Sequence, residues 1–206
     1  MSESAPPTTS DFEPIYELQS VIDRIPVTSM FPKRQPLEIE IGAGDGSFID
    51  QWHQLRPETN YLALERLLGR LTKIRKKALR SGLRNLLGIR VEAAFFTDYL
   101  LPSQCATAFH IYFPDPWPKK RHHKNRLIQA GYAAAVWRAL ERGGVVYLRT
   151  DDVPYFTHMK EVFASLTGLF AETETPGELS AVTTDFERFF NAKGIPTNYA
   201  AYRRIG

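Results

Sequence analysis

Residues able to do chemistry follow five predicted strands of this 206-residue chain. A glycine-rich turn follows strand 37–41, and strands 61–64, 86–91, 107–113 and 145–149 are followed by Glu65, Glu92, Asp115 and Asp151. One acid at a strand end is commonly a helix cap, but the whole set together indicates a ligand site. Because strands alternate with helices, we expect a parallel sheet whose carboxyl edge gathers these groups.

The glycine-rich turn favours a cationic ligand over a dinucleotide. Its glycines, two residues apart, are Gly42, Gly44 and Gly46. A dinucleotide site needs the third glycine five residues after the first, so a nicotinamide oxidoreductase is disfavoured. Glu40 before the turn and Asp45 within it would repel a pyrophosphate, whereas S-adenosylmethionine carries an ammonium and a sulfonium. Glu65 then stands where a carboxylate takes ribose hydroxyls, and Glu92 where one accepts from an adenine amino group.

The segment Phe113-Pro114-Asp115-Pro116-Trp117-Pro118 is the most distinctive part of the chain. Three prolines in five residues fix a rigid, extended loop. Such a loop holds Asp115 and Trp117 at the mouth of the site, and group transfer depends on positioning. Trp117 has two readings, stacking on a base or cofactor and packing within the loop.

The formal net charge of +3 conceals two basic runs. Residues 66–84 and 119–126 hold 13 Lys and Arg side chains and no acid, which leaves a charge of −10 on the rest of the chain. A basic stripe on an acidic body suggests a polyanionic partner, while a solvated helix face is the simpler reading of one run alone.

Taken together, these pieces closely resemble the bacterial tRNA (guanine-N7)-methyltransferase family. The resemblance covers most of residues 37–204 and rests on these segments: Leu37–Gly46, Glu65, Asn85 to Glu92-Ala93, the block from Asp115 to Arg126, Thr150-Asp151, Thr184-Asp185-Phe186-Glu187 and Gly194. It implies an α/β, Rossmann-like class I methyltransferase fold with about seven strands, mostly parallel, and helices on both faces. It also implies methyl transfer from S-adenosylmethionine to N7 of guanosine 46 in the tRNA variable loop.

The resemblance also suggests a role for each candidate residue. The cofactor side comprises Glu40, Gly42, Gly44, Gly46, Glu65, Glu92 and Asp115, and Asp115 is also the catalytic position. The target nucleotide would be contacted by Lys119, Asp151, Thr184, Asp185, Phe186 and Glu187. The tRNA backbone would be held by Lys120, Arg121, Lys124, Arg126, Lys73, Lys76 and Lys77. The family usually has Asp-Ala where this chain has Glu92-Ala93, and Asp98 is an alternative contact for the adenine.

Attack by guanine N7 needs no general base, because this nitrogen carries a free lone pair. Positive charge builds up on the purine, and a fixed carboxylate such as Asp115 or Asp151 can stabilise it and orient the base. Two alternatives remain: a methyltransferase acting on another nitrogen of RNA or DNA, and a non-catalytic RNA-binding module. The latter predicts an eroded glycine turn or loss of Asp115, and neither is seen.

Length and composition predict one domain over residues 13–206 behind a disordered tail, residues 1–12. The single cysteine, Cys105, and the lack of a secretory signal or an apolar run of membrane-spanning length predict a cytoplasmic protein without membrane contact. His122 and His123 lack metal-ligand spacing, so no metal is expected. A monomer and a homodimer both remain possible. Helices are expected over 47–56, from Leu67 to Gly82, over 127–140 with an end at Gly143-Gly144, and over 154–167, with further strands near 169–172 and 199–203.

Overall fold

The computed structural model describes residues 12–206, so the predicted tail lies almost entirely outside the described residues. A single seven-stranded sheet has the order β3-β2-β1-β4-β5-β7-β6, in which β1 to β5 are parallel and β7 is antiparallel to both neighbours. The strands are β1 (Leu37–Ile41), β2 (Asn60–Glu65), β3 (Leu86–Arg90), β4 (Ala106–Tyr112), β5 (Leu140–Thr150), β6 (Phe170–Thr173) and β7 (Asn198–Arg204). The predicted fold class is confirmed.

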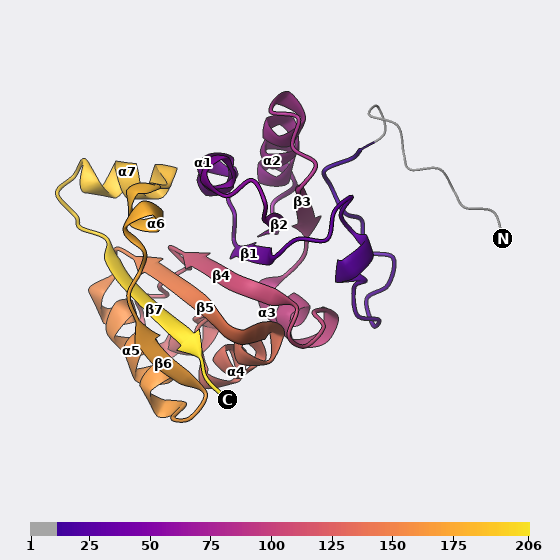
Figure 1. Cartoon of the computed structure of the whole chain (residues 1–206). Coiled ribbons are helices and arrows are strands. Elements are labelled where there is room, and N and C mark those ends of the chain that lie inside the picture. Colours follow the sequence, from indigo (N-terminus) through magenta and orange to yellow (C-terminus); the bar gives the residue numbers. More distant parts are fainter. Residues whose placement is uncertain (1–11) are drawn as a thin grey trace, which may run out of the picture.

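Helices cover both faces of this sheet (Figure 1). One face carries α1 (Ser47–Leu55), α2 (Leu68–Arg80), α6 (Gly177–Ala181) and α7 (Asp185–Asn191). The other carries α3 (Ala93–Phe95), a π-helical turn (Phe96–Leu100), α4 (Ala130–Ala139) and α5 (Val153–Ser165). Each face has its own apolar core, because the central strands are buried on both sides. No helix within residues 12–206 is long and apolar enough to cross a membrane.

The helix predicted over 127–140 is shorter than expected, and its predicted end at Gly143-Gly144 is wrong. Helix α4 ends at Ala139 and β5 begins at the next residue. The β4–β5 ladder pairs Ala106 with Leu140 and then Ala108 with Val145, so the glycines lie in an irregular stretch of the strand. A Cβ at Gly144 would stand 3.0 Å from the Thr107 carbonyl oxygen, so glycine permits this close approach. Helices α6 and α7 were not predicted.

The segment before β1 covers the outer edge of the sheet at Gly88 of β3. The Gly88 amide donates to the Pro14 carbonyl oxygen at 2.8 Å, and the Tyr16 amide donates to the Gly88 carbonyl oxygen at 2.9 Å. Gly88 leaves room for two side chains, since a Cβ there would lie 2.7 Å from Leu71 Cδ1 and 3.1 Å from Ile15 Cδ1. The close approach of this segment therefore depends on a glycine.

Replacing Gly88 by valine should destabilise the fold by about 1–3 kcal/mol, because the branched side chain would overpack the space between α2 and the covering segment. Denaturant unfolding measures the change. Gly131→Val is the matched control: a Cβ there meets nothing within 4 Å, so a change below about 0.5 kcal/mol is expected. Equal effects at the two positions would contradict the proposed close packing.

Candidate active site

The sheet has its topological switch point between β1 and β4. In open α/β sheets, ligands bind outside the carboxyl ends of the strands at such a point. Ile41 of β1 pairs with Leu64 of β2 and with Ile111 of β4. The residues that follow these positions are therefore level with one another, so the glycine turn stands beside Glu65 and the end of β4. This register brings the predicted cofactor turn and the Asp115 loop to the same edge.

The glycine turn adopts a conformation that favours glycine at three positions. Gly42, Gly44 and Gly46 have φ angles of 70°, 59° and 79°, all in the left-handed region. Around Gly42 and Gly44 the space is open, since a Cβ would meet nothing closer than 4.0 Å. The Gly44 amide donates to Glu65 Oε2 at 3.0 Å, so the predicted ribose-binding carboxylate directly braces the turn.

Asp45 within the turn pairs with Lys77 of α2. Lys77 Nζ lies 3.0 Å from Asp45 Oδ2, and both side chains are largely covered. Burial alone would raise the pKa of Asp45, but the Lys77 ammonium and the Ser47 amide hold it below its usual value. Lys77 was predicted to contact the tRNA backbone; instead, the structure places it against the glycine turn.

The two acids that follow β2 and β3 are held in different ways. Glu65 is buried, and its Oε1 accepts from the Leu67 amide at 2.8 Å at the start of α2. Glu92 is exposed and caps α3, accepting from the amides of Ala94 and Phe95. Its carboxylate is therefore fixed at the predicted adenine position and keeps lone pairs free. The alternative residue, Asp98, lies in the exposed part of the π-helical turn.

Glu40 is a buried acid with an unused hydrogen-bonding atom. Its side chain is 4% exposed, and within the described chain Oε2 has no hydrogen-bond partner. Burial raises the pKa of Glu40 well above its usual value, although the Arg149 guanidinium acts in the opposite direction. A cation from a ligand would supply both the missing partner and the missing charge. The residues present therefore fit the ammonium of S-adenosylmethionine.

The Asp115 loop has two rare backbone conformations and is braced by a buried arginine. Phe113 and Trp117, on either side of exposed Asp115, have φ angles of 50° and 45°, which non-glycine residues rarely adopt. Arg126 is 4% exposed, donates from Nε to the Pro116 carbonyl oxygen at 2.8 Å and lies over the Tyr155 ring. Arg126 was also predicted to contact tRNA, but the structure buries it beneath the loop.

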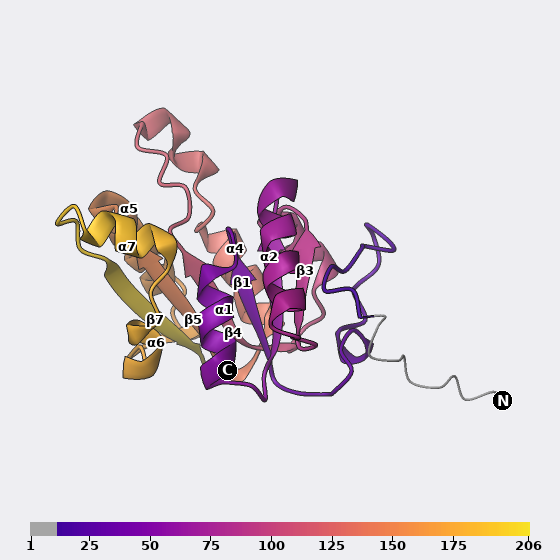
Figure 2. The ribbon, with the colours of Figure 1, turned by 90° about the horizontal axis from the view of Figure 1, so that it is seen from above.

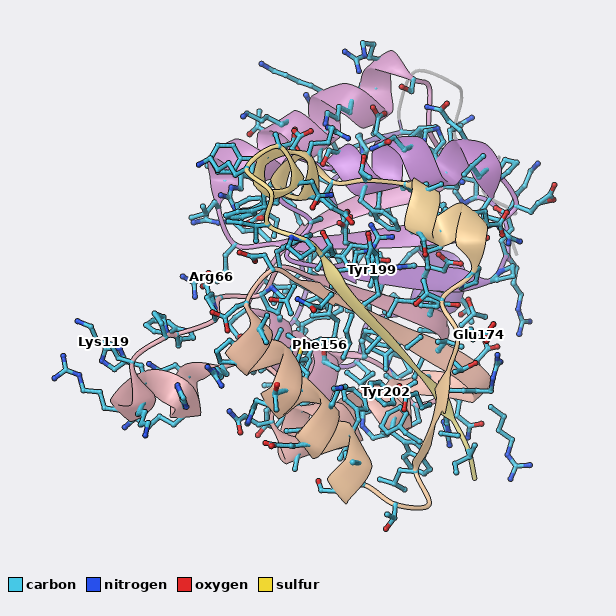
Figure 3. All side chains as sticks on the ribbon, turned by 90° about the vertical axis from the view of Figure 1, so that its left-hand side faces the viewer. Arg66, Lys119, Phe156, Glu174, Tyr199 and Tyr202 are labelled. Atoms are coloured by element: carbon cyan, nitrogen blue, oxygen red, sulfur yellow. The ribbon has the colours of Figure 1, made fainter. Side chains whose placement is uncertain are left out.

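The remaining predicted tRNA contacts lie on the surface. Lys73 and Lys76 on α2 are exposed, as are Lys120, Arg121 and Lys124 in the 3₁₀-helical turn Lys120–Asn125. This turn projects from the body of the protein (Figure 2). Arg66 and Lys119 lie on the same side of the molecule, whereas Glu174 lies on the opposite side (Figure 3). The first residues of the two basic runs, Arg66 and Lys119, therefore lie on the same side.

In the predicted nucleotide-binding stretch 184–187, two side chains are buried and two are exposed. Thr184 and Glu187 are buried and form a capping box at the start of α7, whereas Asp185 and Phe186 are exposed. Glu187 Oε2 also accepts from Arg149 Nη1 at 2.9 Å, with both side chains at most 1% exposed. Sequence reasoning missed Arg149. It also missed the capping box, although the Thr-x-x-Glu spacing before an aromatic run is a signal for one.

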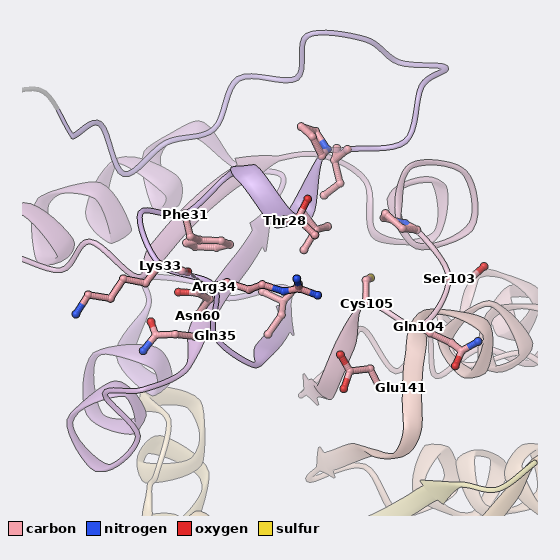
Figure 4. A pocket seen from close by; sticks show the side chains of 15 residues that line it. Thr28, Phe31, Lys33, Arg34, Gln35, Asn60, Ser103, Gln104, Cys105 and Glu141 are labelled. Atoms are coloured by element: carbon pink, nitrogen blue, oxygen red, sulfur yellow. Dashed lines mark hydrogen bonds between the residues drawn. The ribbon is translucent and has the colours of Figure 1, made fainter. Parts of the chain in front are cut away.

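A separate cavity of about 300 Å³ lies at the amino ends of β1 and β2, far from the glycine turn (Figure 4). Its lining includes Leu37, Asn60, Cys105 and Glu141 but none of the predicted site residues. Burial raises the pKa of Cys105 to about 12, so the thiol stays protonated and unreactive at neutral pH.

This strand order, with a glycine turn after β1 and acids after β2 and β3, defines a class I methyltransferase. Solved structures agree on the fold: the 16S rRNA methyltransferase KamB superposes with a TM-score of 0.59 at 17% identity, covering 87% of this chain and 91% of that one. A family model described as "Putative methyltransferase" matches residues 34–199.

Two curated relatives carry a more specific name. The tRNA (guanine-N(7)-)-methyltransferase of Geobacillus kaustophilus is 31% identical over 80% of this chain and 77% of its own length. That of Marinobacter nauticus is 33% identical over 76% of this chain and 65% of its own length, so the chain spans slightly less than two thirds of this relative. The chain belongs to the tRNA (guanine-N(7)-)-methyltransferase family, as its sequence predicted.

Replacing Glu40 by glutamine tests its charge. An acid whose folded pKa is raised destabilises the protein as pH rises above its unfolded pKa of about 4.3. Glutamine does not ionise, so the variant avoids this destabilisation and should be at least as stable as the parent at pH 7. It should bind S-adenosylmethionine about tenfold more weakly, because the ammonium loses a charged hydrogen-bond partner. The parent should also release protons on cofactor binding, measured by calorimetry in buffers of different ionisation enthalpy. Equal proton release by both proteins would contradict the assignment.

Proposed function

We propose that this protein transfers a methyl group from S-adenosylmethionine to N7 of a guanosine in the variable loop of tRNA, at position 46. The observation that carries the proposal is the place of Asp115. It follows β4, the neighbour of β1 in the sheet, on a loop braced by Arg126, and a run of exposed cations follows it in the chain. The names of the family's curated members support the same reaction.

The cofactor would be held by residues whose roles follow from their contacts. Glu40 offers an unpaired buried carboxylate oxygen to the ammonium, and the glycine turn lets the ligand approach its backbone. Glu65, fixed by the Gly44 amide, presents a carboxylate to the ribose hydroxyls, and Glu92 presents one to the adenine. When bound, S-adenosylmethionine would supply an electrophilic methyl carbon to the lone pair of N7, and its sulfonium would leave as a neutral thioether.

The protein must orient the guanine and stabilise its developing charge. Asp115 can accept from the N1 and amino hydrogens of the base, which fixes N7 in one direction. Its negative charge also favours the purine as it becomes cationic, so the same carboxylate acts more strongly in the transition state than in the ground state. Asp151 stands after the neighbouring strand and can share this task.

Exposed cations of the two basic runs would hold the tRNA backbone. Four cations precede or lie in the projecting 3₁₀ turn, and Arg66, Lys73 and Lys76 belong to the other basic run. Phosphate contacts fix the position of a nucleic acid without reading its sequence. The exposed cations can therefore bring the variable loop to the carboxyl edge, where Asp115 recognises the base.

The test is methyl transfer from labelled S-adenosylmethionine to an unmodified tRNA transcript, followed by nucleoside analysis. The expected product is 7-methylguanosine, and methyl on any other atom would overturn the proposal. Asp115→Ala should lower turnover at least about 100-fold and leave tRNA affinity largely unchanged. Asp23→Ala, an exposed acid in the segment before β1, is the control and should retain full activity.

Salt provides a second test, directed at the basic surface. Raising the salt concentration from 50 to 200 mM should weaken tRNA binding by at least about tenfold, because several phosphates are neutralised. Removing Lys120 and Lys124 together should flatten this dependence. Removing Lys33 and Arg34, which line the cavity at the other end of the sheet, deletes the same charge and should leave the slope unchanged. Binding that does not depend on salt would show that these cations do not hold the tRNA backbone.

A further inference from the structure

A row of aromatic rings begins at the end of β4 and continues along α7. The centroids of Phe113 and Phe186 lie 6.2 Å apart with 23° between the ring planes. Phe190 follows at 6.2 Å from Phe186, with 33° between the planes. Phe186 is 50% exposed, so part of its surface is available to a ligand. The row starts two residues before Asp115.

Within the stretch 184–187, Phe186 is the residue best placed to face a ligand. Both carboxylate oxygens of Glu187 are engaged internally: Oε2 accepts from Arg149 and the Thr184 amide, and Oε1 accepts from the Tyr199 hydroxyl. The Thr184 hydroxyl accepts from the Glu187 amide at 3.0 Å. Asp185 is exposed but pairs with Arg188.

Arg149 contacts both α7 and the start of the Asp115 loop. Its carbonyl oxygen accepts from the Phe113 amide at 2.8 Å, at the point where β4 ends. Its guanidinium binds Glu187 and the carbonyl oxygens of Leu179 and Val182. The main chain of Arg149 therefore holds the backbone of Phe113, and its side chain holds the helix that carries Phe186.

We infer that Phe186 stacks on the target guanine, and that the buried Arg149–Glu187 pair is the positioning element that holds this ring against Phe113. This inference rests on the proposed function. The carbon–nitrogen bond formed at N7 leaves a positive charge on the purine, while the departing sulfur becomes neutral. The face of an aromatic ring is electron-rich, so stacking strengthens as the purine becomes cationic. Phe186 therefore contributes to turnover as well as to binding.

The test compares two tRNA transcripts, one with guanosine at the target position and one with an abasic ribose there. The ratio of their affinities measures recognition of the base and cancels the backbone contacts. The parent should bind the intact transcript about tenfold more tightly, and Phe186→Ala should bind both nearly equally, as expected for one lost stacking contact. Phe186→Leu should behave like the alanine variant, and Phe186→Trp should restore the ratio and the turnover.

Phe189→Ala is the matched control. Phe189 lies on the same helix and is 55% exposed, but its ring is covered by Lys193 Nζ at 3.7 Å and does not stack on Phe113. This variant should keep the parental ratio. Glu187→Gln tests the positioning element and should lower the ratio while retaining affinity for S-adenosylmethionine, which shows that the fold is intact.

The outcomes separate this inference from the function on which it rests. If the parent forms 7-methylguanosine but Phe186→Ala keeps the full affinity ratio, the stacking role is wrong. An equal loss of affinity for both transcripts by Phe186→Ala would likewise overturn it, because the residue would then act without the base. If the parent methylates no N7 position, the proposed function fails instead.

Discussion

A buried guanidinium needs an anion and several acceptors, and in this protein Arg149 obtains them from a segment some thirty residues further along the chain. It contacts Glu187 and two carbonyl oxygens, and three aromatic rings, those of Phe48, Tyr112 and Tyr199, surround it. Removing one partner of such a pair costs about 3–5 kcal/mol, because the other charge stays buried without compensation. The segment bearing α6 and α7 is thereby tied to the central sheet, close to the Asp115 loop.

Negative and positive side chains occupy different places around the predicted site. Glu40, Glu65 and Glu92 stand at the ends of three neighbouring strands, where a cationic cofactor is predicted. Arg66 and Lys119, from the two basic runs, lie together on one side of the molecule. Three cations point inward and contact other parts of the protein. Lys77 and Arg126, from the two basic runs, brace the glycine turn and the Asp115 loop, and Arg149 of β5 braces α7. Positive charge thus serves both to position the site and to attract a polyanion.

The sheet and the closeness of the glycine turn to Glu65 could be predicted from local patterns. Alternating strands and helices specify a parallel sheet, and the carboxyl edge of such a sheet necessarily gathers Glu65 and the glycine turn, which indeed share a hydrogen bond. The direction of a long side chain is a tertiary property. An acid-free run shows that Lys77 and Arg126 are cationic, but only the packing of α2 on the turn and of the loop on Tyr155 shows that they point inward. The role of Arg149 depends on a partner 38 residues away, which no local pattern reveals.

The covering segment at Gly88 has a consequence for self-association. An open edge strand offers unpaired amide and carbonyl groups to any other extended chain, and joining of two edges is a common route to aggregates and continuous inter-subunit sheets. Residues 14–16 already occupy the hydrogen-bonding groups of Gly88 at the middle of β3. Two copies could join their sheets through β3 only after displacing this segment, so the fold itself disfavours edge-to-edge pairing of two sheets at β3.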